Sequence, residues 1–143
     1  MKAHPRVIAY LQRAASHEFS AVQQLTLQAV QAEMLGLVPL ASELRQGVQE
    51  EIQHAEQFVG QMLRLGVMPC PSQLRALPVG RTHAELLRFG LATEAEAIRL
   101  YREASQFCER ITDQDNCALF TRILADEVQH HSHIEGAIKA LGP

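Results

Sequence analysis

Apolar residues recur along this chain at alternating intervals of three and four, in four long stretches separated by glycine and proline. The pattern predicts four amphipathic helices of roughly 27–32 residues, each about 40–45 Å long. The apolar face of the fourth helix is expected to continue to Leu141. The predicted helices run from about His4 to Leu35, from Pro39 to near Gly66, from Thr82 to near Arg110, and from Thr112 to Leu141.

The connections between these helices differ in length, and this difference predicts the topology. Short links join the first helix to the second and the third to the fourth, so each pair should form an antiparallel hairpin. The link over residues 67–81 reaches about 50 Å when extended, enough to run the length of the helices. We therefore predict an all-α fold with a single domain over residues 1–143, a four-helix bundle with one long crossover between helices 2 and 3. Thr82-His83-Ala84-Glu85 has the spacing of a capping box.

Each apolar stripe carries one glutamate near its middle, where another apolar residue would be expected. Burial and mutual repulsion both disfavour charged carboxylates, so a cluster of them needs compensating cations. His54 and His130 each follow one of the glutamates by three positions, which places both side chains on the same helix face. Two dications would balance four carboxylates, as in di-metal sites built inside helix bundles. The predicted metal ligands are Glu18, Glu51, His54, Glu94, Glu127 and His130.

The predicted ligands also reveal an internal repeat. Glu18 and Glu94, Glu51 and Glu127, and His54 and His130 are each separated by 76 positions. The repeat predicts a pseudo-twofold axis that relates the two hairpins and places equivalent ligands on either side of a metal pair. A single Glu-x-x-His pair is a weak motif, and the alternative is that these glutamates lie on solvated faces in a different helix register.

Composition narrows the classes of function. The chain has 143 residues, 47% hydrophobic and 20% charged, as is typical of globular proteins. A formal net charge of -3 argues against nucleic-acid binding, and no apolar run approaches the length of a membrane span. Three cysteines without close pairing suggest a reducing compartment, and we expect the cytoplasm. Carboxylate and imidazole ligands without thiolates suit iron, manganese or zinc.

The chain resembles bacterioferritin, a family of the ferritin-like superfamily, over nearly its whole length. The resemblance implies two Fe ions per chain, oxidised by O2 or peroxide, and a ferroxidase active in iron storage or detoxification. It also implies bridging Glu51 and Glu127, terminal Glu18 and Glu94, and one imidazole cap each from His54 and His130. The matching residues are Val7-Ile8-x-Tyr10-Leu11, Glu18, Glu51-x-x-His54-Ala55, Leu65, Pro69, Leu74, Leu77, Gly80, Leu91-Ala92-x-Glu94 and Asp126-Glu127-x-x-His130.

The sequence departs from the family pattern at two positions near the site. The family's haem is held by a methionine from each of two subunits, and the matching position here is Ile52. An aliphatic side chain cannot ligate iron, so we expect no haem of that kind. The family also carries a tyrosine beside the site on the first helix, where this chain has Leu25. Tyr101 is 76 positions later, and we expect it near the metals, either as a redox-active group or as a core tyrosine.

The assembly is also expected to differ, because the sequence stops at Pro143, where bacterioferritins continue into a short fifth helix. Iron oxidation is therefore better supported than storage in a cage. We expect at least a homodimer, with a 24-subunit cage or a mixed shell with a haem-binding paralogue as further possibilities. Two alternatives for the function remain open: a small di-iron oxygenase or peroxidase acting on another substrate, and a haem-free subunit of a mixed bacterioferritin shell.

Two further residues are expected near the ligands. Glu50 precedes a predicted ligand, at a place on the second helix where the family has groups that pass iron or electrons. His133 is one helical turn beyond His130 and is a candidate outer ligand, although such a histidine is more often simply hydrogen-bonded.

Overall fold

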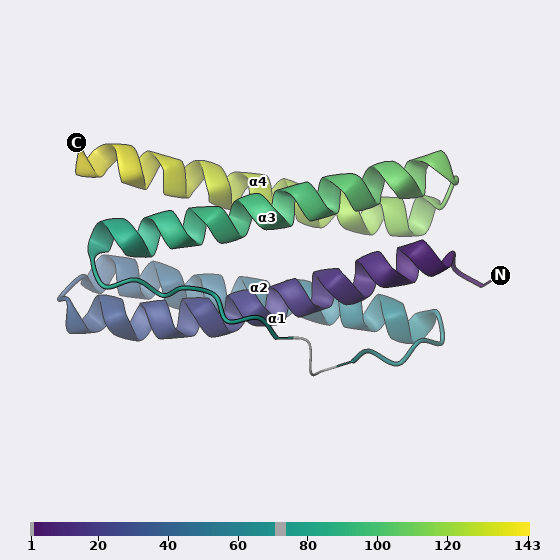
Figure 1. The fold of residues 1–143 in the computed structure, drawn as a ribbon, viewed down its shortest axis with the longest axis horizontal. Helices are drawn as coiled ribbons and strands as arrows, with labels where there is room; N and C mark the ends of the chain where they lie inside the picture. The colour runs from purple at the N-terminus through teal and green to yellow at the C-terminus, as the bar shows by residue number, and fades with distance from the viewer. Residues whose placement is uncertain (1, 71–73) are drawn as a thin grey trace.

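The computed structural model describes residues 2–70 and 74–143, and within them it contains four long helices (Figure 1). Residues 71–73 of the predicted crossover lie outside the described residues. The all-α bundle with one long crossover is confirmed, and the helix ends differ by only a few positions from those expected. The helices are α1 (Pro5–Met34), α2 (Val38–Arg64), α3 (His83–Arg110) and α4 (Gln114–Leu141).

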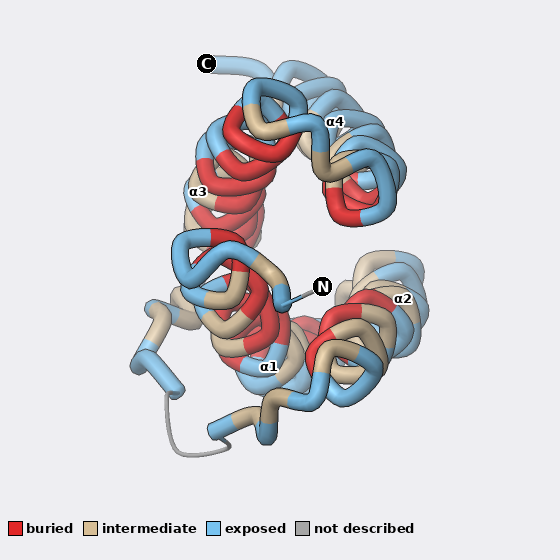
Figure 2. The backbone as a smooth tube through the Cα atoms, turned by 90° about the vertical axis from the view of Figure 1, so that its right-hand side faces the viewer, coloured by how far each residue is buried: buried red, intermediate tan, exposed pale blue. Residues whose placement is uncertain are grey.

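The helices are arranged as two antiparallel hairpins, α1 with α2 and α3 with α4 (Figure 1). The crossover returns along the bundle, so α2 and α3 run in the same direction, as its length predicted. Seen end-on, the buried residues of all four helices face the inside of the bundle (Figure 2). None of the described helices is both long enough and apolar enough to cross a membrane.

Polar side chains of α1 hold the crossover against the bundle. The side-chain amide nitrogens of Gln24 and Gln28 donate to the backbone carbonyl oxygens of Pro78 and Val79, at 2.8 and 2.9 Å. The hydroxyl of Ser20 accepts a hydrogen bond from the backbone N–H of Arg75 at 2.9 Å. These bonds are needed because an irregular segment lying on a protein must satisfy its backbone polar groups without a helix or a strand partner.

The two ends of the bundle are packed differently. The end that holds the start of α1 and the end of α2 contains a large core with five aromatic rings, those of Tyr10, Phe58, Tyr101, Phe107 and Phe120. The other end has only a small cluster of three buried residues, Ala32, Ala41 and Leu86. Leu141, expected on the apolar face, is 42% exposed because it closes α4 beyond this small cluster.

The capping box of α3 is present in altered form. The Thr82 hydroxyl accepts a hydrogen bond from the backbone N–H of Glu85 at 3.2 Å, as predicted. The Glu85 carboxylate accepts from the backbone N–H of Arg81, however, and not from that of Thr82. The crossover enters the helix at Gly80, whose φ of 102° brings the backbone close to the first turn of α3.

We predict that Gly80→Ala destabilises the protein by about 1–3 kcal/mol, whereas Gly136→Ala stabilises it by up to about 1 kcal/mol. At Gly80 the φ is positive, and a Cβ would lie 3.0 Å from backbone atoms of Glu85 and Leu86. At Gly136, inside α4, a Cβ would meet no atom within 4 Å. Urea unfolding of both variants measures the difference, and equal effects would contradict this account of the turn.

Candidate metal centre

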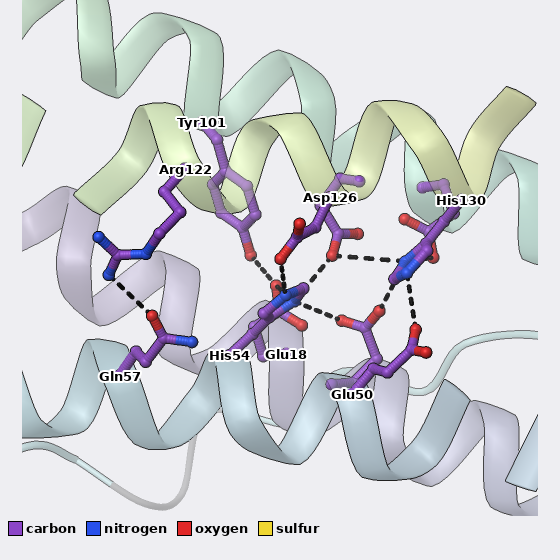
Figure 3. A network of polar contacts seen from close by, with 11 residues as sticks. Glu18, Glu50, His54, Gln57, Tyr101, Arg122, Asp126 and His130 are labelled. Atoms are coloured by element: carbon purple, nitrogen blue, oxygen red, sulfur yellow. Dashed lines mark hydrogen bonds and ion pairs between the residues drawn. The ribbon is translucent and has the colours of Figure 1, made fainter. Parts of the chain in front are cut away.

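The six residues predicted as metal ligands meet at the centre of the bundle, where each projects inward from the middle of its helix (Figure 3). Five of them are buried, and the His130 side chain is 27% exposed. The helix period explains the meeting, because each glutamate replaces an apolar residue on the inward face and each histidine lies one turn further. The donors are Glu18 of α1, Glu51 and His54 of α2, Glu94 of α3, and Glu127 and His130 of α4.

The donor atoms form two overlapping groups. Glu51 and Glu127 belong to both groups, and each group contains two further residues. Within each group, one ligand atom per residue lies within 4.8 Å of all the others. Such a geometry suits two adjacent cations that share two carboxylates. The first group is Glu18, Glu51, His54 and Glu127, and the second is Glu51, Glu94, Glu127 and His130.

The His54 imidazole is held between the donor cluster and a carboxylate outside it. Its Nδ1 atom lies 2.9 Å from Oε1 of Glu127 and 3.5 Å from Oε2 of Glu51. Its Nε2 atom lies 2.9 Å from Oδ2 of Asp126, on the opposite side of the ring. A carboxylate that accepts the Nε2–H proton leaves the Nδ1 lone pair facing the cluster, as a metal ligand requires.

The His130 imidazole has the same arrangement. Its Nδ1 atom lies 3.4 Å from Oε1 of Glu51, and its Nε2 atom lies 2.7 Å from Oε2 of Glu50. The two outer contacts cross between helices, because Glu50 of α2 contacts a histidine of α4 and Asp126 of α4 contacts a histidine of α2 (Figure 3). The two halves of the site are therefore related in detail by the internal repeat.

Sequence reasoning placed Glu50 near the ligands but gave Asp126 no role. The signal that would have found Asp126 is the repeat itself, because Glu50 and Asp126 are also 76 positions apart. The other predicted neighbour, His133, belongs to neither donor group. Its side chain is 68% exposed, and its Nε2 atom lies 3.4 Å from Oε2 of Glu43.

Tyr101 lies directly against the cluster. Its hydroxyl donates a hydrogen bond to Oε1 of Glu18 at 2.5 Å, and its ring packs against Phe58 and Phe120. Burial, and then the charges of Glu18 and Glu127, raise the pKa of the Tyr101 phenol well above its usual value. The phenol is therefore a neutral hydrogen-bond donor that fixes one oxygen of Glu18.

The cluster contains buried polar atoms that lack a partner within the described part of the chain. The Nδ1 atom of His54 and the Oε1 atom of Glu127 lie 2.9 Å apart, but their mutual orientation is not that of a hydrogen bond. One oxygen each of Glu18 and Glu94 is also buried without a partner. An unsatisfied buried polar atom costs about 1–3 kcal/mol. Oxygen and imidazole donors in this state fit two divalent cations such as iron, manganese or zinc.

The carboxylates of the cluster shift one another's pKa values. Burial, and then the charges of neighbouring carboxylates, raise the pKa values of Glu18 and Glu94 well above the usual range. Burial alone would also raise the pKa of Glu51, but hydrogen bonds from Glu18, His130 and His54 outweigh it and lower that pKa. These opposite shifts favour a proton on Glu18 and a negative charge on Glu51.

Contacts with carboxylates raise the pKa values of both histidines. Burial lowers the pKa of His54, but contacts with Glu127, Glu18 and Glu51 outweigh burial, and the pKa is raised. The pKa of His130 is raised chiefly by its contact with Glu51. At neutral pH the metal-free cluster therefore carries protons on groups that would have to lose them before binding a cation.

Comparison with known proteins agrees with this geometry. The Ferritin family, described as a ferritin-like domain, matches residues 8–141. A bacterioferritin of Rhodobacter capsulatus is 32% identical over 146 aligned positions, which cover 100% of this chain and 91% of the relative. The chain belongs to the bacterioferritin family. A bacterial ferritin of Synechocystis is also 32% identical, over 93% of this chain and 85% of the relative.

Solved bacterioferritin structures have the same fold. The Rhodobacter capsulatus bacterioferritin, described as having a metal-free dinuclear site and a haem iron, superposes with a TM-score of 0.95 at 31% identity. The match covers 98% of this chain and 88% of that one. Mycobacterium tuberculosis bacterioferritin BfrA also gives a TM-score of 0.95, at 25% identity, over 99% of this chain and 89% of that one.

For this member of the bacterioferritin family, we predict that Zn(II) binding releases protons and that its apparent affinity increases with pH. The raised pKa values of Glu18, Glu94, His54 and His130 mean that a cation displaces protons at neutral pH. Lowering the pH therefore weakens binding. Titration calorimetry in buffers of different ionisation enthalpy measures the release, and a pH-independent affinity would contradict the assignment.

We further predict that Asp126→Ala and Glu50→Ala each weaken one of two Zn(II) equivalents by about 10–100-fold, because each removes the acceptor that orients one imidazole. Competition with a chromophoric chelator measures the two affinities separately. Glu135→Ala is the matched control, since Glu135 is exposed on α4 and contacts His131, which is not a predicted ligand. Unchanged affinities in both variants would show that these contacts do not hold the imidazoles for metal.

Proposed function

We propose that this protein is a bacterioferritin-type ferroxidase, which binds two Fe(II) ions in the bundle core and oxidises them with O2 or peroxide. The observation that carries the proposal is the pair of four-residue donor groups that share Glu51 and Glu127. Family membership alone would be weaker support, because a fold can host unrelated activities. Here the donors themselves supply the chemistry.

In the proposed reaction the two ferrous ions are the substrate. Each ion loses one electron, and O2 takes up two electrons and two protons to give hydrogen peroxide; with peroxide as the oxidant, the product is water. Glu51 and Glu127 would bridge the two ions. Together with Glu18 and Glu94 they supply four negative charges, which balance the charge of two dications. The same donors suit Mn(II) or Zn(II), which would occupy the site without this reaction.

The surrounding residues keep the donors in place during the reaction. Asp126 and Glu50 hold the two imidazoles with their Nδ1 atoms toward the carboxylates. The Tyr101 hydroxyl holds Glu18 in one orientation. Phe58 and Phe120 pack beside Tyr101 and exclude water from that side of the site. A rigid ligand set with little solvent access favours a defined reaction over uncontrolled iron chemistry.

We propose that the chain binds no haem of the family's type. The position of the family's methionine ligand is Ile52, which is half-buried on α2 and has no atom able to ligate iron. The remaining methionine of α2, Met62, is 1% exposed in the core and ten positions away, about 15 Å along the helix.

We also propose that the protein forms at least a homodimer through α1 and α2. Large apolar side chains of α1 remain exposed in the single chain, including Phe19 at 40%, Leu27 at 49% and Val30 at 51%. An apolar strip of this kind on one helix favours association. A 24-subunit cage, or a mixed shell with a haem-binding paralogue, would extend the same dimer and would favour a role in iron storage over detoxification.

Aerobic titration of the metal-free protein with Fe(II) tests the proposal. We expect rapid oxidation of two Fe(II) per chain, and size exclusion with light scattering then separates the roles. Hundreds of irons in a large particle would support storage, and two irons per chain on a dimer would support a di-iron enzyme. The absence of any fast phase would exclude a ferroxidase.

We predict that Glu127→Ala abolishes this fast phase while the bundle stays folded. Glu127 is 1% exposed and belongs to both donor groups, so its loss removes a ligand from both ions. The fold should tolerate the change because one fewer buried carboxylate lowers the repulsion in the metal-free cluster. Stopped-flow absorbance measures oxidation and circular dichroism measures folding. Glu56→Ala, at an exposed position of α2, is the control, and oxidation retained in Glu127→Ala would refute the site.

The oxygenase alternative has one specific observation in its favour. A cavity of about 470 Å³ adjoins Glu51, Glu94 and His130 on the side of the site opposite Tyr101. A ferroxidase does not require a cavity of this size, whereas a di-iron oxygenase needs room for an organic substrate beside its metals.

A further inference from the structure

The internal repeat relates two halves of the bundle that are filled very differently. On one side of the metal centre four inward positions carry large side chains, and the residue 76 positions away from each is smaller. The pairs, with the larger member first, are Tyr101 and Leu25, Phe58 and Ile134, Phe120 and Leu44, and Ile123 and Gly47.

The half with the larger side chains is closely packed. Tyr101, Phe58, Phe120 and Ile123 are all 0% exposed. The ring centroids of Tyr101 and Phe58 are 5.3 Å apart, and those of Phe58 and Phe120 are 5.4 Å apart. Contacts at these distances leave no room for a ligand on this side of the metal centre.

The half with the smaller side chains contains the cavity of about 470 Å³. Its walls include all four smaller counterparts, Leu25, Ile134, Leu44 and Gly47. Close packing does not require glycine at these two wall positions. A Cβ on Gly47 would lie 3.5 Å from Leu25 and one on Gly90 would lie 3.8 Å from Ile134, which are ordinary van der Waals distances. The volume is in the range of small-molecule sites, and the walls are mainly apolar.

Apart from the proposed metal ligand Glu94, one residue of the cavity wall, Gln28, has a side-chain polar atom without a partner in the described structure. The Gln28 amide nitrogen donates to the carbonyl oxygens of Val79 and Leu86, at 2.9 and 3.1 Å, which fixes the orientation of the amide. Its Oε1 atom is left buried with no hydrogen-bond partner in the described structure. That oxygen lies 3.9 Å from the Cβ position of Gly90, another wall residue, and the counterpart of Gln28 in the packed half is Ala104.

We propose that this cavity binds a small, mainly apolar organic molecule that bears a hydroxyl group, with Gln28 Oε1 accepting the hydroxyl proton. The apolar part of the walls would cover the body of the molecule, and the unpaired Gln28 oxygen, which lies outside the proposed metal ligands, would select for a donor. The molecule would lie beside Glu94 and His130, within reach of the proposed metal positions. The inference goes beyond iron oxidation and does not depend on it.

The test compares p-cresol with p-xylene, which replaces the hydroxyl by a methyl group of similar size. Titration calorimetry on the protein with iron removed, with and without added Zn(II), measures both affinities. We expect saturable binding, with p-cresol about two- to tenfold tighter than p-xylene because of one added hydrogen bond. Since no iron is present, a negative result would overturn the ligand site and leave the ferroxidase proposal intact.

Three variants locate the binding. Leu25→Phe puts an aromatic ring where the packed half has Tyr101, and we expect at least about a tenfold loss of affinity for both probes because the cavity is filled. Leu141→Phe is the matched control, with the same change at an exposed position at the end of α4 that does not line the cavity, and should bind normally. Gln28→Leu should remove the preference for p-cresol while p-xylene still binds.

Two results would overturn the proposal. The first is no saturable binding of either probe, which would mean that the cavity holds only solvent. The second is binding that Leu25→Phe leaves unchanged, which would place the probes elsewhere on the protein. If Gln28→Leu does not fold after losing its hydrogen bonds to Val79 of the crossover and Leu86 of α3, Leu25→Phe and its control still decide the outcome.

Discussion

Four carboxylates buried within a few ångströms of one another are the constraint on which the rest of this structure depends. In a folded chain without cations, such a cluster is tolerated only because protons and imidazoles neutralise part of its charge. The pKa of Glu18 is raised and that of neighbouring Glu51 is lowered, and Nδ1 of His54 lies 2.9 Å from Oε1 of Glu127. The donor cluster fits divalent cations, which would displace these protons on binding.

The internal repeat of 76 positions determines the symmetry of the site. Each hairpin contributes one lone glutamate and one Glu-x-x-His pair, so two identical half-sites meet across a pseudo-twofold axis. The outer carboxylates follow the same rule, since Asp126 and Glu50 each hold the histidine of the opposite hairpin. These crossed contacts join α2 to α4 at the centre of the bundle.

The symmetry extends to the candidate ligands and the outer carboxylates that contact the histidines, but not to the packing on either side of the site. Beyond the ligands, one half is filled by Tyr101, Phe58 and Phe120, and the other half contains a cavity. The two halves are alike at the six candidate ligands and at Glu50 and Asp126, and they differ at inward positions further along the helices. A bundle with one packed half can keep the ligands in register while the other half remains open beside them.

Much of the fold and the candidate site could be predicted from the sequence because helix geometry is local. The period of 3.6 residues places Glu18, Glu51, Glu94 and Glu127 on inward faces, and the three-residue spacing adds each histidine to the same face. The length of the crossover decided that α2 and α3 are parallel. The family also followed from these motifs, and comparison with known proteins confirmed it.

The contacts between helices were decided only by the tertiary structure. Asp126 and His54 are 72 positions apart in the chain, and their contact depends on how closely α2 and α4 approach. The same is true of which imidazole nitrogen faces the cluster, of the hydrogen bond from Tyr101 to Glu18, and of the unpaired oxygen of Gln28. A helical pattern determines which face a residue occupies, whereas distances and cavities depend on the packing of several helices at once.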